Sequence, residues 1–142
     1  MQTTLKTDVT FEGTGLHSGE SVRVVLHPAA ANSGIVFRRT DVAGRPKMRA
    51  DFRDVIVSPL NTRLSDADGV TVSTIEHLMA ALAGCGVHNA LVDINGPEVP
   101  ILDGSAASFV RGIVEAGLTR LSAPLHAIEI LREVSVSEGG AT

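Results

Sequence analysis

Two adjacent residues, Glu76 and His77, carry the side chains of this sequence best suited to do chemistry together. A neutral histidine is a frequent zinc ligand, and a carboxylate beside the metal can act as a general base toward water. Zinc usually needs two further protein ligands, so one histidine and one glutamate do not complete a site. A simpler interpretation is also open, in which Glu76 forms a capping box with Ser73 and His77 is only an exposed helix residue.

A helix over residues 73–84 is expected to hold these two side chains. Its apolar residues recur at helical spacing and predict one buried stripe, made of Ile75, Leu78, Met79 and Leu82. Gly84 and Gly86 supply a stop for the helix. One and two turns beyond Glu76 and His77 the helix carries only small residues, namely Ala80, Ala81, Ala83 and Gly84. Such a face lets another backbone approach closely and leaves the two polar side chains uncovered.

The rest of the chain predicts a sheet with helices packed against it. The strands expected before the first helix cover residues 21–27 and 34–39, with shorter candidates at 52–57 and 62–65. A strand at 89–94 and a helix from about Ser105 to Gly117 follow. Two helices covering one face of a mixed or antiparallel sheet make an α+β two-layer sandwich, which we assign to residues 1–121. Residues 122–142 are predicted to be a linker and the first strand, over 127–136, of a second domain.

Composition excludes several classes of protein. The chain has 142 residues, which suits one domain, and its 44% hydrophobic content is enough for a core. The net charge is −4 and aromatics are 3% of the residues, which argues against nucleic acid as a partner. No apolar stretch resembles a signal peptide or a transmembrane helix, and Cys85 is the single cysteine. We therefore expect a cytoplasmic protein.

Four motifs, in this order along the chain, resemble the N-terminal half of one enzyme family. The motifs are Gly15-Leu16-His17-Ser18-Gly19, Phe37-Arg38-Arg39-Thr40-Asp41, the helix start from Ser73 to Leu82, and the stretch from Asn95 to Ala107. Together they are similar to the zinc-dependent UDP-3-O-acyl-N-acetylglucosamine deacetylases of lipid A synthesis. The resemblance runs from about Thr4 to Gly139, which is nearly the whole chain.

The resemblance implies a fold, a cofactor and a site. Members of this family have two similar α+β domains, with the fold of the second domain of ribosomal protein S5, packed with their helices inside. Their cofactor is Zn²⁺. By motif match, His77 corresponds to the first zinc ligand and Glu76 to the general base that acts against the N-acetyl carbonyl. Leu60, Asn61 and Thr62 correspond to the loop that lines the substrate side. The implied substrate is UDP-3-O-acyl-N-acetylglucosamine, and the implied product is acetate.

One departure from the family changes what this chain can do alone. The family takes its other zinc ligands from a later His-Lys-x-x-Asp stretch in the second domain, and this sequence has none. His126 and Glu129 are a weak replacement because we expect them on a strand. The simplest interpretation is a fragment that holds the first domain, binds zinc weakly and is inactive alone. A natural short paralogue is the less simple alternative.

Two further residues and one rival function stay open. His17 is expected to be a turn residue or to make a supporting hydrogen bond behind the site, with a place near the site itself as the alternative. Asp103 is placed to cap the second helix rather than to take part in catalysis. The rival function is a non-catalytic binding or interaction module, in which the small-residue face docks a partner helix and Glu76 is only a cap.

Overall fold

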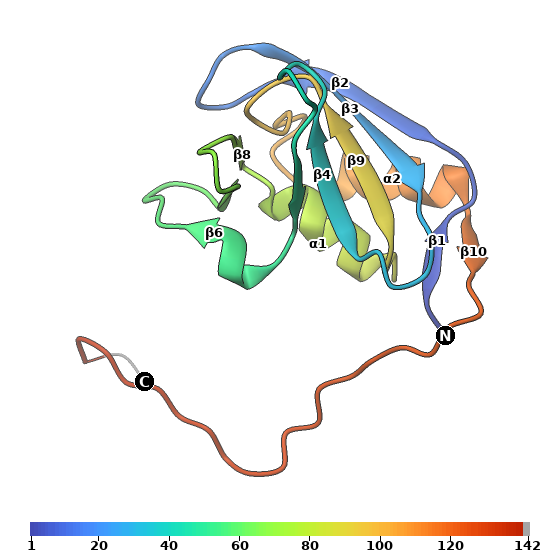
Figure 1. Ribbon diagram of the computed structural model, residues 1–142, viewed down its shortest axis with the longest axis vertical. Coiled ribbons are helices and arrows are strands. Elements are labelled where there is room, and N and C mark those ends of the chain that lie inside the picture. The colour runs from blue at the N-terminus through green and yellow to red at the C-terminus, as the bar shows by residue number, and fades with distance from the viewer. Residues whose placement is uncertain (141–142) are drawn as a thin grey trace.

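A five-stranded mixed sheet lies at the centre of the structure, a computed structural model in which residues 1–140 are described. Its strand order is β2-β3-β9-β4-β5, and only the β9–β4 pair is parallel. A two-stranded sheet (β1-β10) and a three-stranded sheet (β6-β7-β8) flank it (Figure 1). The elements in chain order are β1 (Thr3–Leu5), β2 (Val9–Thr14), β3 (Ser21–Pro28), β4 (Ile35–Arg39), β5 (Lys47–Arg49), β6 (Val55–Ile56), β7 (Arg63–Ser65), β8 (Thr71–Ser73), α1 (Glu76–Gly84), β9 (Ala90–Ile94), α2 (Ala107–Ala116) and β10 (Leu118–Arg120).

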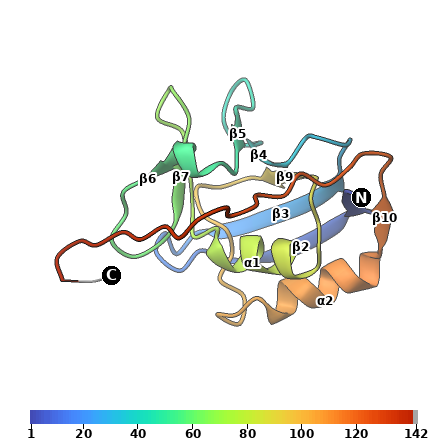
Figure 2. The same ribbon diagram turned by 90° about the horizontal axis from the view of Figure 1, so that it is seen from below.

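Both helices cover the same face of the five-stranded sheet, as Figure 2 shows from below. Strand β3 explains why: its alternate residues Val22, Val24 and Leu26 are buried, whereas the residues between them are exposed or half-buried. The buried set faces the helices and the other set faces solvent. The predicted α+β arrangement, a mixed sheet with two helices on one face, is therefore confirmed.

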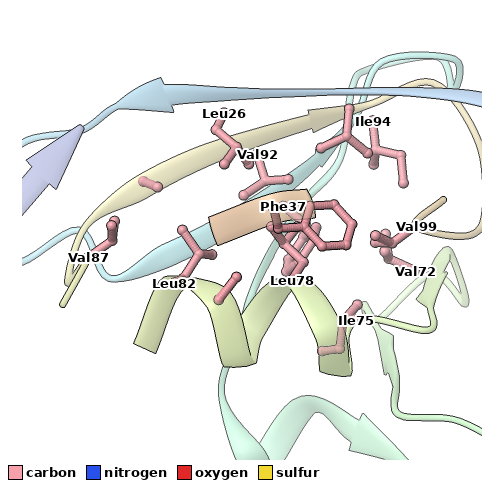
Figure 3. Close-up of a cluster of buried hydrophobic side chains, with 14 of the residues drawn as sticks. Leu26, Phe37, Val72, Ile75, Leu78, Leu82, Val87, Val92, Ile94 and Val99 are labelled. Atoms are coloured by element: carbon pink, nitrogen blue, oxygen red, sulfur yellow. The ribbon is translucent and has the colours of Figure 1, made fainter. Parts of the chain in front are cut away.

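The core lies between the sheet and α1. Leu78 and Leu82 of the helix point toward Val92 of β9 and Phe37 of β4, and all four side chains are at most 1% exposed (Figure 3). Helix α2 extends this core through Phe109, whose ring meets Phe11 of β2 edge-on with the ring centroids 4.9 Å apart. Leu78 and Leu82 of the predicted apolar stripe thus pack α1 onto the sheet, and this packing fixes the position of the helix start.

The start of α1 differs from the prediction in one detail. Ser73 lies at the end of strand β8 rather than at the helix cap, and the cap residue Ile75 makes no side-chain capping bond. The expected capping box between Ser73 and Glu76 is therefore wrong. Pairing of Ser73 with Arg63 of β7 accounts for the difference, because it keeps the residue in an extended strand.

Two other expected elements also differ. The first half of the 52–57 candidate strand is a 3₁₀ turn, Phe52–Asp54, held by the Asp51 side chain that accepts from the Arg53 N–H. No strand forms over 127–136 in the part of the chain described here. Strand formation there needs a neighbouring edge, and every residue from 124 to 140 is exposed. Residues 141 and 142, the end of the predicted second segment, lie outside the described residues. None of the described helices is long and apolar enough to cross a membrane.

Candidate functional site

Glu76 is the first residue of α1, and its carboxylate is held by a neighbouring loop. The Thr62 backbone N–H donates to Glu76 Oε2 at 3.1 Å. Both residues line a hollow of about 240 Å³ that Phe52, Val55 and Met79 make largely apolar. The Glu76 carboxylate thus lies at the wall of a mostly apolar hollow, with one oxygen held by Thr62 and no capping bond to its own helix. A carboxylate in this position can accept a proton from a small molecule.

His77 follows Glu76 in the first turn of α1 and is half-buried. Within residues 1–140 its ring makes no hydrogen bond and no ion pair, so no described residue occupies either ring nitrogen. The same part of the chain contains no group of three or more His, Cys, Asp or Glu side chains that could hold a metal ion. The donor chemistry of His77 fits zinc, but the described residues supply one such donor rather than a complete set.

The loop predicted to contact substrate is only partly joined to Glu76. Thr62 bonds to Glu76 directly, and the Asn61 side-chain amide donates to Thr74 Oγ1 at 3.2 Å. Leu60 is 75% exposed and lines neither the hollow at Glu76 nor the one at Asn61. The structure therefore brings two of the three loop residues to the start of α1 and leaves Leu60 in solvent.

Thr74 connects this loop to a buried carboxylate. Its hydroxyl donates to Glu98 Oε1 at 2.7 Å, and its backbone φ is +55°. A β-branched residue in the left-handed region is an outlier, and such strain persists only where the surroundings hold it. Here the hydrogen bond between Thr74 and Glu98 is short, and both residues are buried, at 3% and 2% exposed. Thr74 lies two residues before Glu76, so its conformation sets the direction in which α1 begins.

Glu98 also binds the loop that follows β2. The Ser18 N–H donates to Glu98 Oε2 at 2.7 Å, and the His17 N–H lies 3.1 Å from both carboxylate oxygens. Burial alone raises the pKa of Glu98, but the bonds from Thr74, Ser18 and His17 outweigh burial and hold the pKa below its ordinary value. Glu98 is therefore a buried anion stabilised by hydrogen bonds from two segments far apart in the sequence.

His17 lies near the site, although its ring makes no hydrogen bond within residues 1–140. It lines a second hollow, of about 280 Å³, together with Asn61, Arg63 and Glu98. The observed contact of His17 is structural, since its backbone N–H donates to Glu98, as expected of a residue that makes a supporting hydrogen bond. Asp103 lies in the turn before α2, where its carboxylate accepts from Ser105 and Ser108; the cap residue of this helix is Ala106.

The small-residue face of α1 is narrower than the sequence indicates. Ala80, Ala83 and Gly84 are exposed, whereas Ala81 is fully buried in the core. Placing Ala81 on that face was therefore wrong, because it lies three residues after Leu78 and joins the buried stripe.

Glu98 and Thr74 are the two site residues that the sequence analysis missed. Pro97 and Pro100 flank Glu98, and apolar Val99 and Ile101 follow it. A lone acidic residue in an apolar, proline-bounded segment was the available signal, since such a residue is buried only with partners. Thr74 gave no signal of this kind, because a positive φ at a threonine depends on tertiary contacts.

This chain is similar to known proteins along nearly its whole length. The model of the UDP-3-O-acyl N-acetylglycosamine deacetylase family matches residues 2–142. Curated relatives named UDP-3-O-acyl-N-acetylglucosamine deacetylase include those of Geotalea uraniireducens (49% identical), Phenylobacterium zucineum (50%) and Photobacterium profundum (44%). Each match covers 97% of this chain but only 45–47% of the relative, so the chain spans just under half of their length. On this family match, the chain belongs to the UDP-3-O-acyl N-acetylglycosamine deacetylase family.

Proposed function

We propose that this chain supplies the general base and one zinc ligand of an enzyme that hydrolyses the N-acetyl group of UDP-3-O-acyl-N-acetylglucosamine, in lipid A synthesis. The observation that carries the proposal is the bond between the Thr62 N–H and Glu76 Oε2, at the wall of a hollow and beside His77. This bond leaves Oε1 of Glu76 as the oxygen that takes a proton from the attacking water. The names of the relatives supply the substrate.

The donor set fits zinc only in part, which determines what the chain can do alone. His77 is the residue of this chain that would hold the ion, and the remaining ligands would come from a second domain. Zinc, when bound, polarises the amide carbonyl and lowers the pKa of water. Glu76 then accepts the proton, and Thr62 keeps its carboxylate turned toward the hollow. We infer that residues 1–121 form the first domain and that residues 122–142 lead to the second.

The proposed fold, cellular compartment and contact with a second domain are each supported by a different feature of the chain. The order of strands and helices favours the ribosomal protein S5 domain 2-like fold that the resemblance implies. The single cysteine, Cys85, favours a reducing compartment, and we propose the cytoplasm. The exposed face made by Ala80, Ala83 and Gly84 favours close packing of a helix from the second domain.

The rival function, a non-catalytic interaction module, uses the same exposed face of α1. It requires Glu76 to be only a helix cap. The lack of a side-chain capping bond at the start of α1 argues against this requirement, and the bond from Thr62 gives Glu76 a different partner.

Two measurements test the proposal. Isothermal titration of the 142-residue chain with Zn²⁺ is expected to show weak binding that His77→Ala abolishes. His126→Ala is the matched control, because His126 is exposed on the segment after β10. Undiminished binding in His77→Ala would overturn the zinc assignment.

The second measurement is acetate release from UDP-3-O-acyl-N-acetylglucosamine. The chain alone is expected to be inactive, and the chain joined to the second half of the Geotalea uraniireducens relative is expected to be active. Turnover by the chain alone would overturn the division of the site between two domains. A folded, zinc-loaded but inactive joined enzyme would overturn the proposed activity.

A further inference from the structure

We propose that Glu98 is a positioning residue for the catalytic end of α1, and that it acts through the Thr74 hydroxyl. The inference rests on the proposed function, because it assigns Glu98 a role in orienting the general base. Its basis is one connected set of contacts. Glu98 Oε1 accepts from Thr74 Oγ1 at 2.7 Å, Thr74 Oγ1 accepts from Asn61, and Thr62 binds Glu76.

Within residues 1–140, Glu98 forms no salt bridge. Its contacts include the Thr74 hydroxyl, the backbone N–H groups of His17 and Ser18, and the Ser18 side chain. A carboxylate that is 2% exposed needs such donors to remain an anion. The carboxylate gives these donors one shared acceptor group, and an apolar residue of similar size would leave them without a partner.

Backbone hydrogen bonds fix the chain between β8 and α1 beside Glu98. The Ser73 N–H donates to the Pro97 carbonyl at 2.9 Å, and the Val99 N–H donates to the Ser73 carbonyl at 3.0 Å. These bonds place Glu98 directly beside Thr74 and fix the strand end. The chain then turns at Thr74 with φ of +55° and enters α1 within two residues. A strained turn that a buried carboxylate holds in place fixes the position of the first residues of the helix.

The same carboxylate also holds the loop of residues 15–18. A Cβ atom at Gly15 would lie 2.5 Å from Glu98 Oε2, so the backbone of this loop closes directly on the carboxylate. Glu98 therefore joins three segments, the Gly15–Ser18 loop, the Thr74 turn and, through Thr74, the loop that contains Asn61 and Thr62. Loss of the Glu98 charge is expected to let the Glu76 side chain adopt other orientations, while the core under α1 stays packed.

The test uses Glu98→Gln and Thr74→Val, which keep the side-chain size and remove the charge or the hydroxyl. Thr74→Ser keeps the hydroxyl and is the conservative rescue. Asp93→Asn is the matched control, because Asp93 pairs with Arg38 on the sheet face that the helices leave open. The double variant Glu98→Gln/Thr74→Val tests whether the two residues act as one unit.

In the 142-residue chain, the ¹H–¹⁵N resonance of Thr62 is expected to shift in Glu98→Gln and Thr74→Val but not in Asp93→Asn. In the joined enzyme, kcat is expected to fall about 10–100-fold in each of the first two variants, and no further in the double variant. Thr74→Ser is expected to keep a kcat within about threefold of wild type. Asp93→Asn is expected to lose stability without losing kcat.

The two readouts separate failure of this inference from failure of the proposed function. An unmoved Thr62 resonance in both Glu98→Gln and Thr74→Val overturns the inference, whatever the activity. The inference is also overturned if the fold-loss of kcat in the double variant equals the product of the two single fold-losses. Such a result would show that Glu98 and Thr74 act independently. If the joined wild-type enzyme is folded but inactive, the proposed function fails, and the Thr62 resonance still decides whether Glu98 orients the loop at α1. Should Glu98→Gln not fold, Thr74→Val alone carries the same test.

Discussion

The Thr62 backbone N–H lies 3.1 Å from Glu76 Oε2, and this bond ties the start of α1 to the loop that precedes strand β7. The bond takes up one oxygen of the carboxylate and leaves the other at the hollow that both residues line. A backbone donor cannot be removed by side-chain substitution at Thr62. The orientation of Glu76 therefore depends on the loop conformation, which Asn61 and Thr74 maintain through their own hydrogen bond.

Gly15→Ala is expected to lower the free energy of unfolding by about 1–3 kcal/mol. A Cβ atom there would overlap Ser18 Oγ and lie 2.5 Å from Glu98 Oε2, so the Ser18 side chain and the buried carboxylate, or the loop itself, must move. Gly84→Ala is the control, because no atom lies within 4 Å of the Cβ position at Gly84. Urea unfolding of both variants checks the prediction, and equal stabilities would contradict it.

Asp93→Asn is expected to lower the free energy of unfolding at pH 7 by about 1.5–3 kcal/mol. Arg38 Nε and Nη2 each donate to the Asp93 carboxylate at 2.6 Å, and His27, which also contacts Asp8, lies 3.3 Å away. Burial raises the pKa of Asp93, but the bonds and charge of Arg38, with His27, outweigh it and leave the pKa below its ordinary value.

The sign of the pH effect follows from that lowered pKa. The stabilisation is present above the unfolded-state pKa of about 3.9 and is lost as the pH falls through the lower folded-state value. The difference in unfolding free energy between wild type and Asp93→Asn should therefore shrink as the pH is lowered below about 4. Urea titrations at a series of pH values measure it, and a difference that stays constant down to the acid limit would speak against this role for Asp93.

Removal of the chain after residue 125 is expected to leave the melting temperature nearly unchanged. Every residue from 126 to 140 is exposed, and Figure 1 shows this segment running away from the sheets. Truncation after Arg120 is the informative comparison. It removes the backbone bonds of Gln2 with Leu121 and Ala123, and Ala123 is only 6% exposed. That shorter chain should melt several degrees lower, at about 1 kcal/mol per bond lost. Equal melting temperatures in calorimetry would contradict the prediction.

The sequence predicted the elements that periodicity specifies. The alternation of Val22, Val24 and Leu26 places β3, and the spacing of Leu78 and Leu82 places α1, because burial on one face produces both patterns. Gly117, with φ of +73°, ends α2 as expected. Burial patterns of this kind are local, and one chain is enough to reveal them.

The features that the sequence did not reveal depend on contacts between distant segments. Ser73 has the right residue type for a helix cap, yet pairing with Arg63 keeps it in a strand. Glu98 is polar, yet donors from the Gly15–Ser18 loop and from Thr74 make its burial possible. The strand expected over 127–136 has the right alternation but no neighbouring edge within residues 1–140. Roles for Glu76, His77, Leu60, Asn61 and Thr62 came from the family resemblance and remain proposals.

The most direct test of this account is kcat of Glu76→Gln in the chain joined to the second half of the Geotalea uraniireducens relative. Glutamine keeps an oxygen that can accept from the Thr62 N–H, so the fold should be preserved, but it cannot take a proton from water. The account predicts a loss of about 10²–10⁴-fold in kcat with the melting temperature unchanged. A kcat within about threefold of wild type would show that Glu76 is not the general base and would contradict the account.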